Sequence, residues 1–166
     1  MDYKIEEMTE ENWEGVAKIY LEGINTGKAT FQSEIPSFQD WDKNHIKICR
    51  LVACKKNKVL GWAALSPTSS RCVYAGVAEV SIYIGEEYRG QGIGKNILKS
   101  LVKLSEENGI WTLQSGIVRE NNASIALHKS CGFRELGIRE QVAKMPNGIW
   151  HDVVLMERRS SIVGID

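Results

Sequence analysis

The stretch that most constrains the fold runs from residue 79 to residue 95 and reads EVSIYIGEEYRGQGIGK. In its first half, β-branched apolar residues alternate with other residues, which predicts a strand that ends near Ile84. A glycine-rich turn follows. After Lys95 the apolar residues recur at helical spacing until Asn108-Gly109, a typical helix stop. A strand, a turn and a helix in this order open a right-handed crossover, so we expect the next strand to be parallel to the first.

The glycine-rich turn is suited to binding phosphate. Its three glycines would leave backbone N–H groups free beside a helix N-terminus, with Arg89 and Lys95 adding positive charge. A P-loop is excluded, because residue 89 is not glycine and residue 96 is neither serine nor threonine. A dinucleotide fingerprint fails as well, because Lys95 occupies the place of its third glycine. A glycine turn without a ligand is the less favoured alternative.

The remaining pattern, Arg89-x-x-Gly92-x-Gly94, resembles the acetyl-CoA pyrophosphate loop of the GCN5-related N-acetyltransferase (GNAT) superfamily. Two further signatures extend the resemblance: Asn121-x-Ala123-Ser124-Ile125-x-Leu127-His128, followed by Cys131-Gly132-Phe133, and Gly148-x-Trp150-His151-Asp152-Val153. In this order and spacing the three motifs resemble the phosphinothricin and methionine sulfoximine N-acetyltransferase group. The resemblance covers almost the whole chain.

Composition limits the classes of partner. The 166 residues fit one domain, and 21 basic residues balance 21 acidic ones, so no basic field indicates nucleic acid. The four cysteines lack metal-binding spacing and are expected as buried residues or free thiols in a reducing compartment. No apolar run is long enough to cross a membrane, and the N-terminal residues do not resemble a signal peptide. We expect a cytoplasmic protein without a metal.

The remaining elements can be read in chain order. A short strand precedes a helix capped by Thr9, and Ser37 caps a second helix that carries His45 and Ile48 on its apolar face. Hairpins are expected at residues 51–65 and 133–157, a long strand with a bend or bulge at Gly76 at residues 73–84, and a strand at residues 112–118. A fourth helix starts at residue 121 or 122. Residues 160–166 read as a loose tail.

The resemblance implies an α/β (α+β) GNAT fold: a mixed, mostly antiparallel sheet of about seven strands with about four helices and a splayed parallel pair in the middle. Acetyl-CoA would lie in that notch, with its pantetheine arm along the strand edge and its pyrophosphate on the glycine loop. The cofactor-binding residues implied are Ile82, Tyr83, Ile84, Arg89, Gly90, Gln91, Gly92, Ile93, Gly94, Lys95, Asn121 and Ser124. For Asn121, a helix N-cap is an equally good and compatible reading.

Two residues are candidates for catalysis. Glu79 is a carboxylate inside an apolar strand, which is unfavourable unless it faces a cleft or a partner. The resemblance places it, directly or through water, to accept the proton that an ammonium acceptor must lose. A structural glutamate paired across the sheet is the alternative. His128 stands where many relatives carry the tyrosine that protonates the leaving thiolate, and it could instead only pack and hydrogen-bond. A backbone N–H near Val80, at an expected bulge, could polarise the thioester carbonyl.

The amine acceptor is less well defined. The resemblance places substrate contacts at Phe31, Arg71, Tyr74, Lys144 and Trp150, with Arg71 as the cation for an amino acid carboxylate. The loop at residues 66–70 lacks the tryptophan and basic residues that relatives often show there. We expect N-acetylation of a small amino acid or analogue by a homodimer. The alternative acceptors are a polyamine, an aminoglycoside and a protein N-terminus, and the alternative function is that of a non-catalytic acyl-CoA-binding module.

Overall fold

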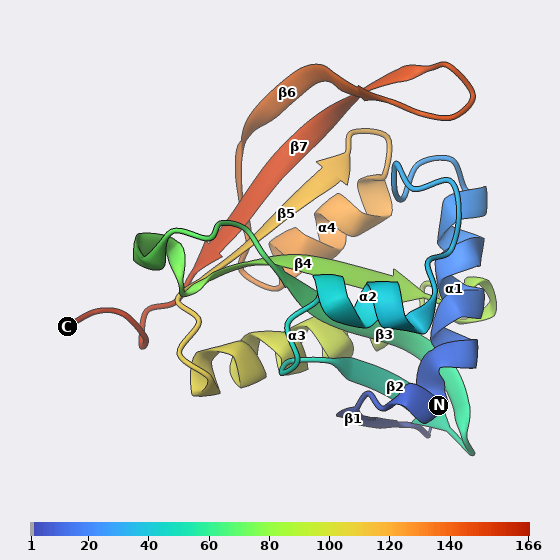
Figure 1. The fold of residues 1–166 in the computed structure, drawn as a ribbon, viewed down its shortest axis with the longest axis horizontal. Coiled ribbons are helices and arrows are strands. Elements are labelled where there is room, and N and C mark those ends of the chain that lie inside the picture. Colours follow the sequence, from blue (N-terminus) through green and yellow to red (C-terminus); the bar gives the residue numbers. More distant parts are fainter. Residues whose placement is uncertain (1) are drawn as a thin grey trace.

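The computed structural model describes residues 2–166 and contains one seven-stranded sheet in the order β1-β2-β3-β4-β5-β7-β6 (Figure 1). The strands are β1 Lys4–Glu7, β2 Leu51–Lys55, β3 Lys58–Pro67, β4 Val77–Ile84, β5 Thr112–Val118, β6 Arg134–Lys144 and β7 Trp150–Arg159. The helices are α1 Trp13–Asn25, α2 Phe38–Asn44, α3 Ile93–Glu107 and α4 Asn122–Ser130. The predicted fold class is confirmed.

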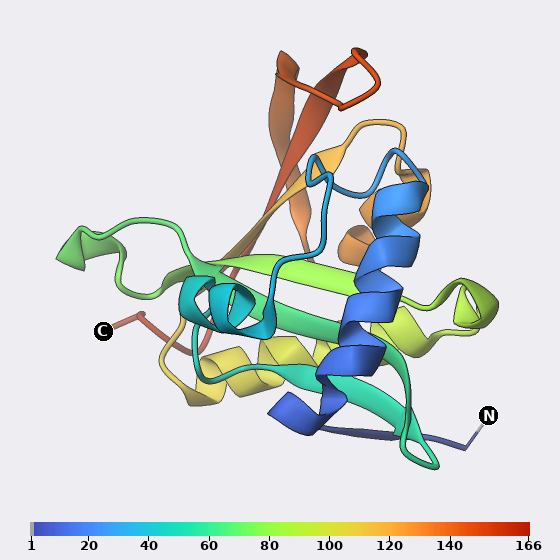
Figure 2. The ribbon, with the colours of Figure 1, turned by 45° about the vertical axis from the view of Figure 1, so that its right-hand side comes forward.

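Helices cover both faces of the sheet, and a separate apolar core lies under each layer (Figure 2). On one face Val16 and Tyr20 of α1 pack with Trp41 of α2 and with Trp62 of β3. On the other face the apolar stripe of α3 packs on β2 to β5, and part of α4 joins it. Because successive residues of β4 point to opposite faces, its odd-numbered side chains face α1 and its even-numbered ones face α3.

The parallel pair predicted from residues 79–95 is confirmed, and it is short. β4 and β5 pair only from Val77 with Thr112 to Glu79 with Gln114, and then diverge. On its other edge β4 pairs with β3 without a break, from Gly61 with Ile84 to Pro67 with Ala78. The bulge expected near Val80 is therefore absent. The notch in the sheet arises because β5 turns away to pair with β7 along its full length.

Local capping sets the helix starts. Thr9 precedes a 3-10 turn, Glu10–Asn12, that leads into α1, and its backbone N–H donates to Asn12 Oδ1 over 2.8 Å. Ser37 Oγ accepts from the Asp40 N–H over 3.2 Å and so caps α2, as predicted. The second helix is shorter than expected, because it ends at Asn44. His45 adopts an extended backbone and stacks on Trp41, so neither His45 nor Ile48 belongs to the helix.

Two other expectations were wrong. Residues 73–84 do not form one strand: a 3-10 turn, Cys72–Tyr74, comes first, and Gly76 precedes β4. A Cβ at Gly76 would lie 2.0 Å from the Trp111 ring, so close packing of that indole requires glycine there. Residues 160–166 are not loose either, because Arg159 donates to the carbonyls of Val163 and Gly164 and folds the segment into a turn.

Candidate active site

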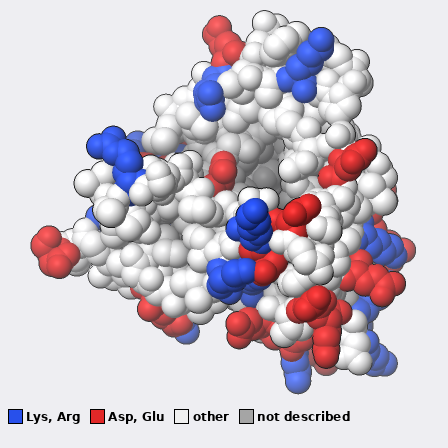
Figure 3. Space-filling model, in the orientation of Figure 1, with Lys and Arg blue, Asp and Glu red and all other residues white. Residues whose placement is uncertain are grey.

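A cavity of about 720 Å³ lies where β4 and β5 diverge. Its wall is built by five segments: the loop after α1, β4, the turn that leads into α3, the end of β5, and α4 with the turn before it. Figure 3 shows this region as a hollow with an acidic side chain inside it. The same cavity is lined by the glycine turn at one end and by Glu79 and Phe31 at the other.

The glycine turn forms one end of the cavity. Gly90 and Gly92 have φ angles of 73° and 80°, and the space where their Cβ atoms would project is open. Gly92 is the N-cap of α3, so the free N–H groups of the first helical turn lie beside this open space. Gly94 has a different role. A Cβ there would come within 3.3 Å of Leu127, so its absence lets α3 and α4 approach closely.

The edge of β4 leads from this turn toward the centre of the cavity. Gly85 donates to the Leu60 carbonyl over 2.8 Å, and hydrogen-bonded pairs alternate along an antiparallel ladder. The backbone groups of Ile82 and Ile84 therefore point away from β3, into the gap that β5 leaves. Across this gap Asn121 caps α4, its Oδ1 accepting from the Ser124 N–H over 3.2 Å. The cap uses the side-chain oxygen and leaves the amide nitrogen to donate.

Glu79 is placed at the last paired position before the strands diverge. Its carboxylate faces Gly116 of β5, where a Cβ would lie 3.9 Å from Glu79 Oε1. Although the side chain is open to the cavity, the surrounding protein replaces water and raises the pKa of Glu79 above its ordinary value. A carboxylate with a raised pKa is a stronger base than an ordinary surface glutamate.

His128 lines the same cavity from α4, and its side chain is 1% exposed. Its Nδ1 lies 2.7 Å from the carbonyl oxygen of Ser124, which can only accept, so Nδ1 carries the proton. Its Nε2 is then an acceptor, and it finds no hydrogen-bond partner among the described residues. Burial lowers the pKa of His128, so the ring is neutral near pH 7.

Side chains from distant segments form the other end of the cavity. Phe31, from the loop after α1, meets His151 of β7 edge-on, with ring centroids 6.5 Å apart. His151 Nδ1 lies 3.0 Å from Glu120 Oε2, which belongs to the turn between β5 and α4. The next residue, Asp152, accepts from Arg119 and from the Gln141 N–H, both over 2.8 Å. His151 and Asp152 thus tie β7 to the turn that carries Asn121.

One cavity thus brings together a glycine turn with open space beside a helix N-terminus, a free strand edge and a carboxylate with a raised pKa. A family model described as "Acetyltransferase (GNAT) family" matches residues 6–133. The chain belongs to the acetyltransferase (GNAT) family. The family prediction made from the motifs at residues 89–94, 121–133 and 148–153 is confirmed.

Individual GNAT proteins are also similar to this chain. The phosphinothricin N-acetyltransferase of Alcaligenes faecalis is 32% identical over 150 residues, which are 86% of this chain and 75% of that protein. A phosphinothricin acetyltransferase from Sinorhizobium meliloti, solved in complex with AcCoA, is 27% identical with a TM-score of 0.89, over 100% of this chain and 92% of that one. A ribosomal-protein-alanine N-acetyltransferase from Brucella melitensis is 28% identical with a TM-score of 0.86, over 95% of this chain and 99% of that one.

Most of the predicted site residues of this GNAT chain meet in the cavity. The predicted residues found in its lining are Phe31, Glu79, Ile82, Tyr83, Ile84, Arg89, Gly90, Gly92, Ile93, Gly94, Lys95, Asn121, Ser124 and His128. Arg89 Nε donates to the Ile84 carbonyl over 3.2 Å, which holds its guanidinium beside the turn. Gln91 is not part of the lining, and its side-chain amide donates to the Glu87 carbonyl instead.

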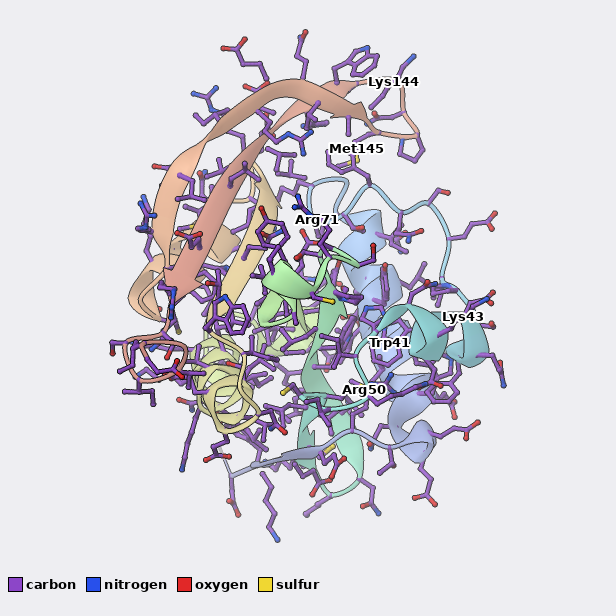
Figure 4. All side chains as sticks on the ribbon, turned by 60° about the vertical axis from the view of Figure 1, so that its left-hand side comes forward. Trp41, Lys43, Arg50, Arg71, Lys144 and Met145 are labelled. Atoms are coloured by element: carbon purple, nitrogen blue, oxygen red, sulfur yellow. The ribbon has the colours of Figure 1, made fainter. Side chains whose placement is uncertain are left out.

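Four predicted acceptor contacts lie outside the cavity lining. Arg71 stacks on Tyr74 with its guanidinium 5.6 Å from the ring centroid, in the turn before β4. Lys144 stacks on Trp150 over 5.8 Å at the tip of the β6–β7 hairpin. Figure 4 shows Lys144 directed outward at this tip, whereas Met145 beside it, 4% exposed, points inward.

Sequence reasoning missed two charged residues of the cavity. Lys28 precedes Phe31 in the loop after α1, and Glu120 precedes the predicted Asn121. Glu120 could have been found, since it adjoins a motif residue, whereas the loop of Lys28 carries no local pattern. Among residues 2–166, no cluster of three His, Cys, Asp or Glu side chains is placed to hold a metal ion. Within the same range, no helix has the length and apolar character needed to cross a membrane.

Proposed function

We propose that this chain transfers the acetyl group of acetyl-CoA directly to the amino group of a small amino acid or analogue, of the phosphinothricin or methionine sulfoximine kind. The observation that carries the proposal is the single cavity that connects the glycine turn with Glu79. The similarity to phosphinothricin acetyltransferases, one of them solved with AcCoA, supports both the donor and the acceptor class.

Acetyl-CoA would occupy the end of the cavity near α3. Its pyrophosphate would meet the N–H groups of the turn, with Arg89 and Lys95 adding charge and Gln91 and Ile93 completing the loop. The pantetheine arm would lie along the free edge of β4, next to Tyr83, held by the backbone groups of Ile82 and Ile84 and by the Asn121 amide. Ser124 would complete this contact from α4.

Glu79 would act as the general base. The acceptor arrives as an ammonium ion, since free α-amino groups have a pKa of about 8, and it must lose a proton before the nitrogen can attack the thioester carbonyl. The raised pKa of Glu79 lies closer to the pKa of the ammonium group than that of an ordinary glutamate, which favours this proton transfer. Transfer within a ternary complex needs no covalent enzyme intermediate, so the free cysteines take no part.

His128 would protonate the departing CoA thiolate. Because Nε2 is unprotonated at rest, His128 must first take up a proton, and the attacking amine releases one as the amide forms. The proton balance then closes: one proton leaves through Glu79, and the second passes by way of Nε2 to the thiolate sulfur. A histidine whose pKa is lowered by burial gives up such a proton readily.

The acceptor would enter from the Phe31 end of the cavity. Phe31 would contact its aliphatic part, and Arg71 would bind its carboxylate. Tyr74, Lys144 and Trp150 would form the outer rim, where they already pair with each other or with Arg71. We further propose a cytoplasmic homodimer: all four cysteines are free thiols, and the unpaired edge strand β6 exposes Leu136 and Ile138.

A protein N-terminus is the second candidate acceptor, favoured by the similarity to a ribosomal-protein-alanine N-acetyltransferase. An assay of thiol release from acetyl-CoA, run over free amino acids, their analogues, a polyamine, an aminoglycoside and a peptide with N-terminal alanine, separates these acceptors. We expect turnover with the free amino acids and a strong loss in Glu79→Gln. Acetyl-CoA binding without thiol release from any amine would overturn the enzymatic proposal in favour of a binding module.

A further inference from the structure

The acceptor end of the cavity carries an unusual balance of charge. Two carboxylates line it, Glu79 and Glu120. Lys28 is the one cation among the lining residues of the described chain that lies outside the glycine turn and its flanks. The second carboxylate has no part in the proton transfers proposed above. A charged group that faces the acceptor but takes no part in the chemistry influences which acceptors bind.

Glu120 is ionised and held in place. His151 Nδ1 hydrogen-bonds its Oε2 over 3.0 Å, and this contact is the main cause that lowers the pKa of Glu120. The side chain of His151 is only 12% exposed, whereas that of Glu120 is 56% exposed. His151 also packs edge-on against Phe31, so the ring that holds Glu120 contacts two lining residues of the cavity. The carboxylate thus lies at the cavity wall, held by a hydrogen bond from a largely buried histidine.

Little in this part of the cavity could neutralise a second anion on the acceptor. The cations predicted for this end, Arg71 and Lys144, stack on Tyr74 and Trp150 outside the lining. Arg119 is paired with Asp152 over 2.8 Å. If Arg71 or Lys28 binds the α-carboxylate, one cation at most is left at this end to balance Glu79, Glu120 and an acidic side chain on the acceptor. Like charges brought together in a partly enclosed site repel strongly.

We propose that Glu120 is a specificity-determining residue that selects acceptors whose side chain ends in a neutral or cationic N–H group and disfavours those with an acidic side chain. Such a side chain can donate to the Glu120 carboxylate, whereas a phosphinate or carboxylate is repelled by it. This inference rests on the proposed function and divides the proposed amino acid substrates by side chain. Amino acids whose side chain carries a sulfoximine, an amide or an amine are good acceptors, and those with a phosphinate are poor ones.

The test measures kcat/KM for acceptors matched in shape and different in charge: glutamine against glutamate, and methionine sulfoximine against phosphinothricin. We expect the wild-type protein to prefer the uncharged member of each pair by about tenfold or more. Glu120→Gln should reduce that preference by about tenfold, and Glu120→Lys should reverse it, with the KM for acetyl-CoA unchanged. Glu140→Gln, an exposed charge removal on β6, is the matched control and should leave the preference intact.

The outcomes are distinguishable. If Glu120→Gln keeps the wild-type ratio of kcat/KM between the members of each pair, or changes both values equally, Glu120 does not select the acceptor. The acetyltransferase proposal then still stands. A wild-type preference for phosphinothricin over methionine sulfoximine overturns the inference as well. If the wild-type protein acetylates no amine, the proposed function fails, and this inference fails with it. A thermal melt of each variant confirms that the compared proteins are folded.

Discussion

The two ends of the cavity are built in different ways. The cofactor end, where we propose that acetyl-CoA binds, consists mainly of backbone: the turn at Gly90 and Gly92, the free edge of β4 and the first N–H groups of α3. The acceptor end, where we propose that the amine binds, consists of side chains, with Phe31, Glu79 and Glu120 contributed by three separate segments. A backbone site is specified by contiguous sequence and tolerates exchange of most side chains, whereas a side-chain site changes with each substitution. We therefore expect variants to separate the two ends.

The largest effect is expected for Glu79→Gln. The amide keeps the shape of the side chain and removes its basicity, so kcat should fall by about 10²- to 10⁴-fold. Acetyl-CoA binding, which we propose for the other end of the cavity, should be unchanged. Because burial raises the pKa of Glu79, the wild-type rate should fall as pH drops through that raised pKa. The pH–rate profile of the variant should lack this acid limb. Steady-state kinetics over pH measure both quantities.

Ser81→Ala provides the control for Glu79→Gln, since it alters a polar side chain two residues along β4 on the same face. Its kcat should stay close to that of the wild type. If Glu79→Gln retained the wild-type kcat and acid limb, the base would have to be another group.

The second effect concerns the backbone at the cofactor end. Gly92 has a φ of 80° and open space at its Cβ position, so Gly92→Ala introduces strain and a methyl group beside the proposed pyrophosphate. We expect the KM for acetyl-CoA to rise by about tenfold, with little change in acceptor KM. Gly148→Ala is a matched control, because Gly148 has a φ of 85° at the β6–β7 turn, far from the cofactor end in the fold.

Both glycine variants should lose a similar amount of stability, about 1–2 kcal/mol, because both place a Cβ in left-handed backbone. Only the loop variant should lose cofactor affinity. Equal effects on the acetyl-CoA KM would show that strain alone, rather than the position of the turn, explains the loss.

The difference between a cavity end built from backbone and one built from side chains also explains what could be predicted from the sequence. The strand, glycine turn, helix and parallel strand lie within residues 77–118, where local periodicity is informative, and all were predicted. The Asn121 cap was predicted because capping is a local interaction. The contact of His151 with Glu120 and Phe31 joins segments far apart in the chain, and no local pattern encodes it. The bulge near Val80 was expected at the notch, which instead results from the pairing of β5 with β7.

The third effect tests the carboxylate contact at the acceptor end. Arg71→Gln removes a cation that stacks on Tyr74, and we expect the KM for amino acid acceptors to rise by roughly tenfold. An acceptor whose carboxylate is replaced by an amide should be affected far less. Arg139→Gln, on exposed β6, is the control. If Lys28→Gln rather than Arg71→Gln raises the KM, the carboxylate lies deeper in the cavity, against the loop after α1.

The smallest effect compares two histidines that make the same side-chain hydrogen bond in different backbone settings. His45 Nδ1 lies 2.6 Å from the Trp41 carbonyl and His128 Nδ1 lies 2.7 Å from the Ser124 carbonyl, each four residues back along the chain. Burial lowers both pKa values below the ordinary 6.5. Since the unfolded chain binds these protons more tightly, both should stabilise the fold above pH 6.5, and that stability is lost as pH falls through the lowered values.

Only His128 lines the cavity, so acetyl-CoA should change its titration and leave that of His45 unchanged. NMR titration of the imidazole protons, with and without a saturating acetyl-CoA analogue that is not hydrolysed, measures both values in one sample. A ligand-induced shift of equal size at His45 would point to a global change in the fold. A pKa above 6.5 at His128 would contradict the neutral, Nδ1-protonated ring, and with it the proton path through Nε2 to the thiolate.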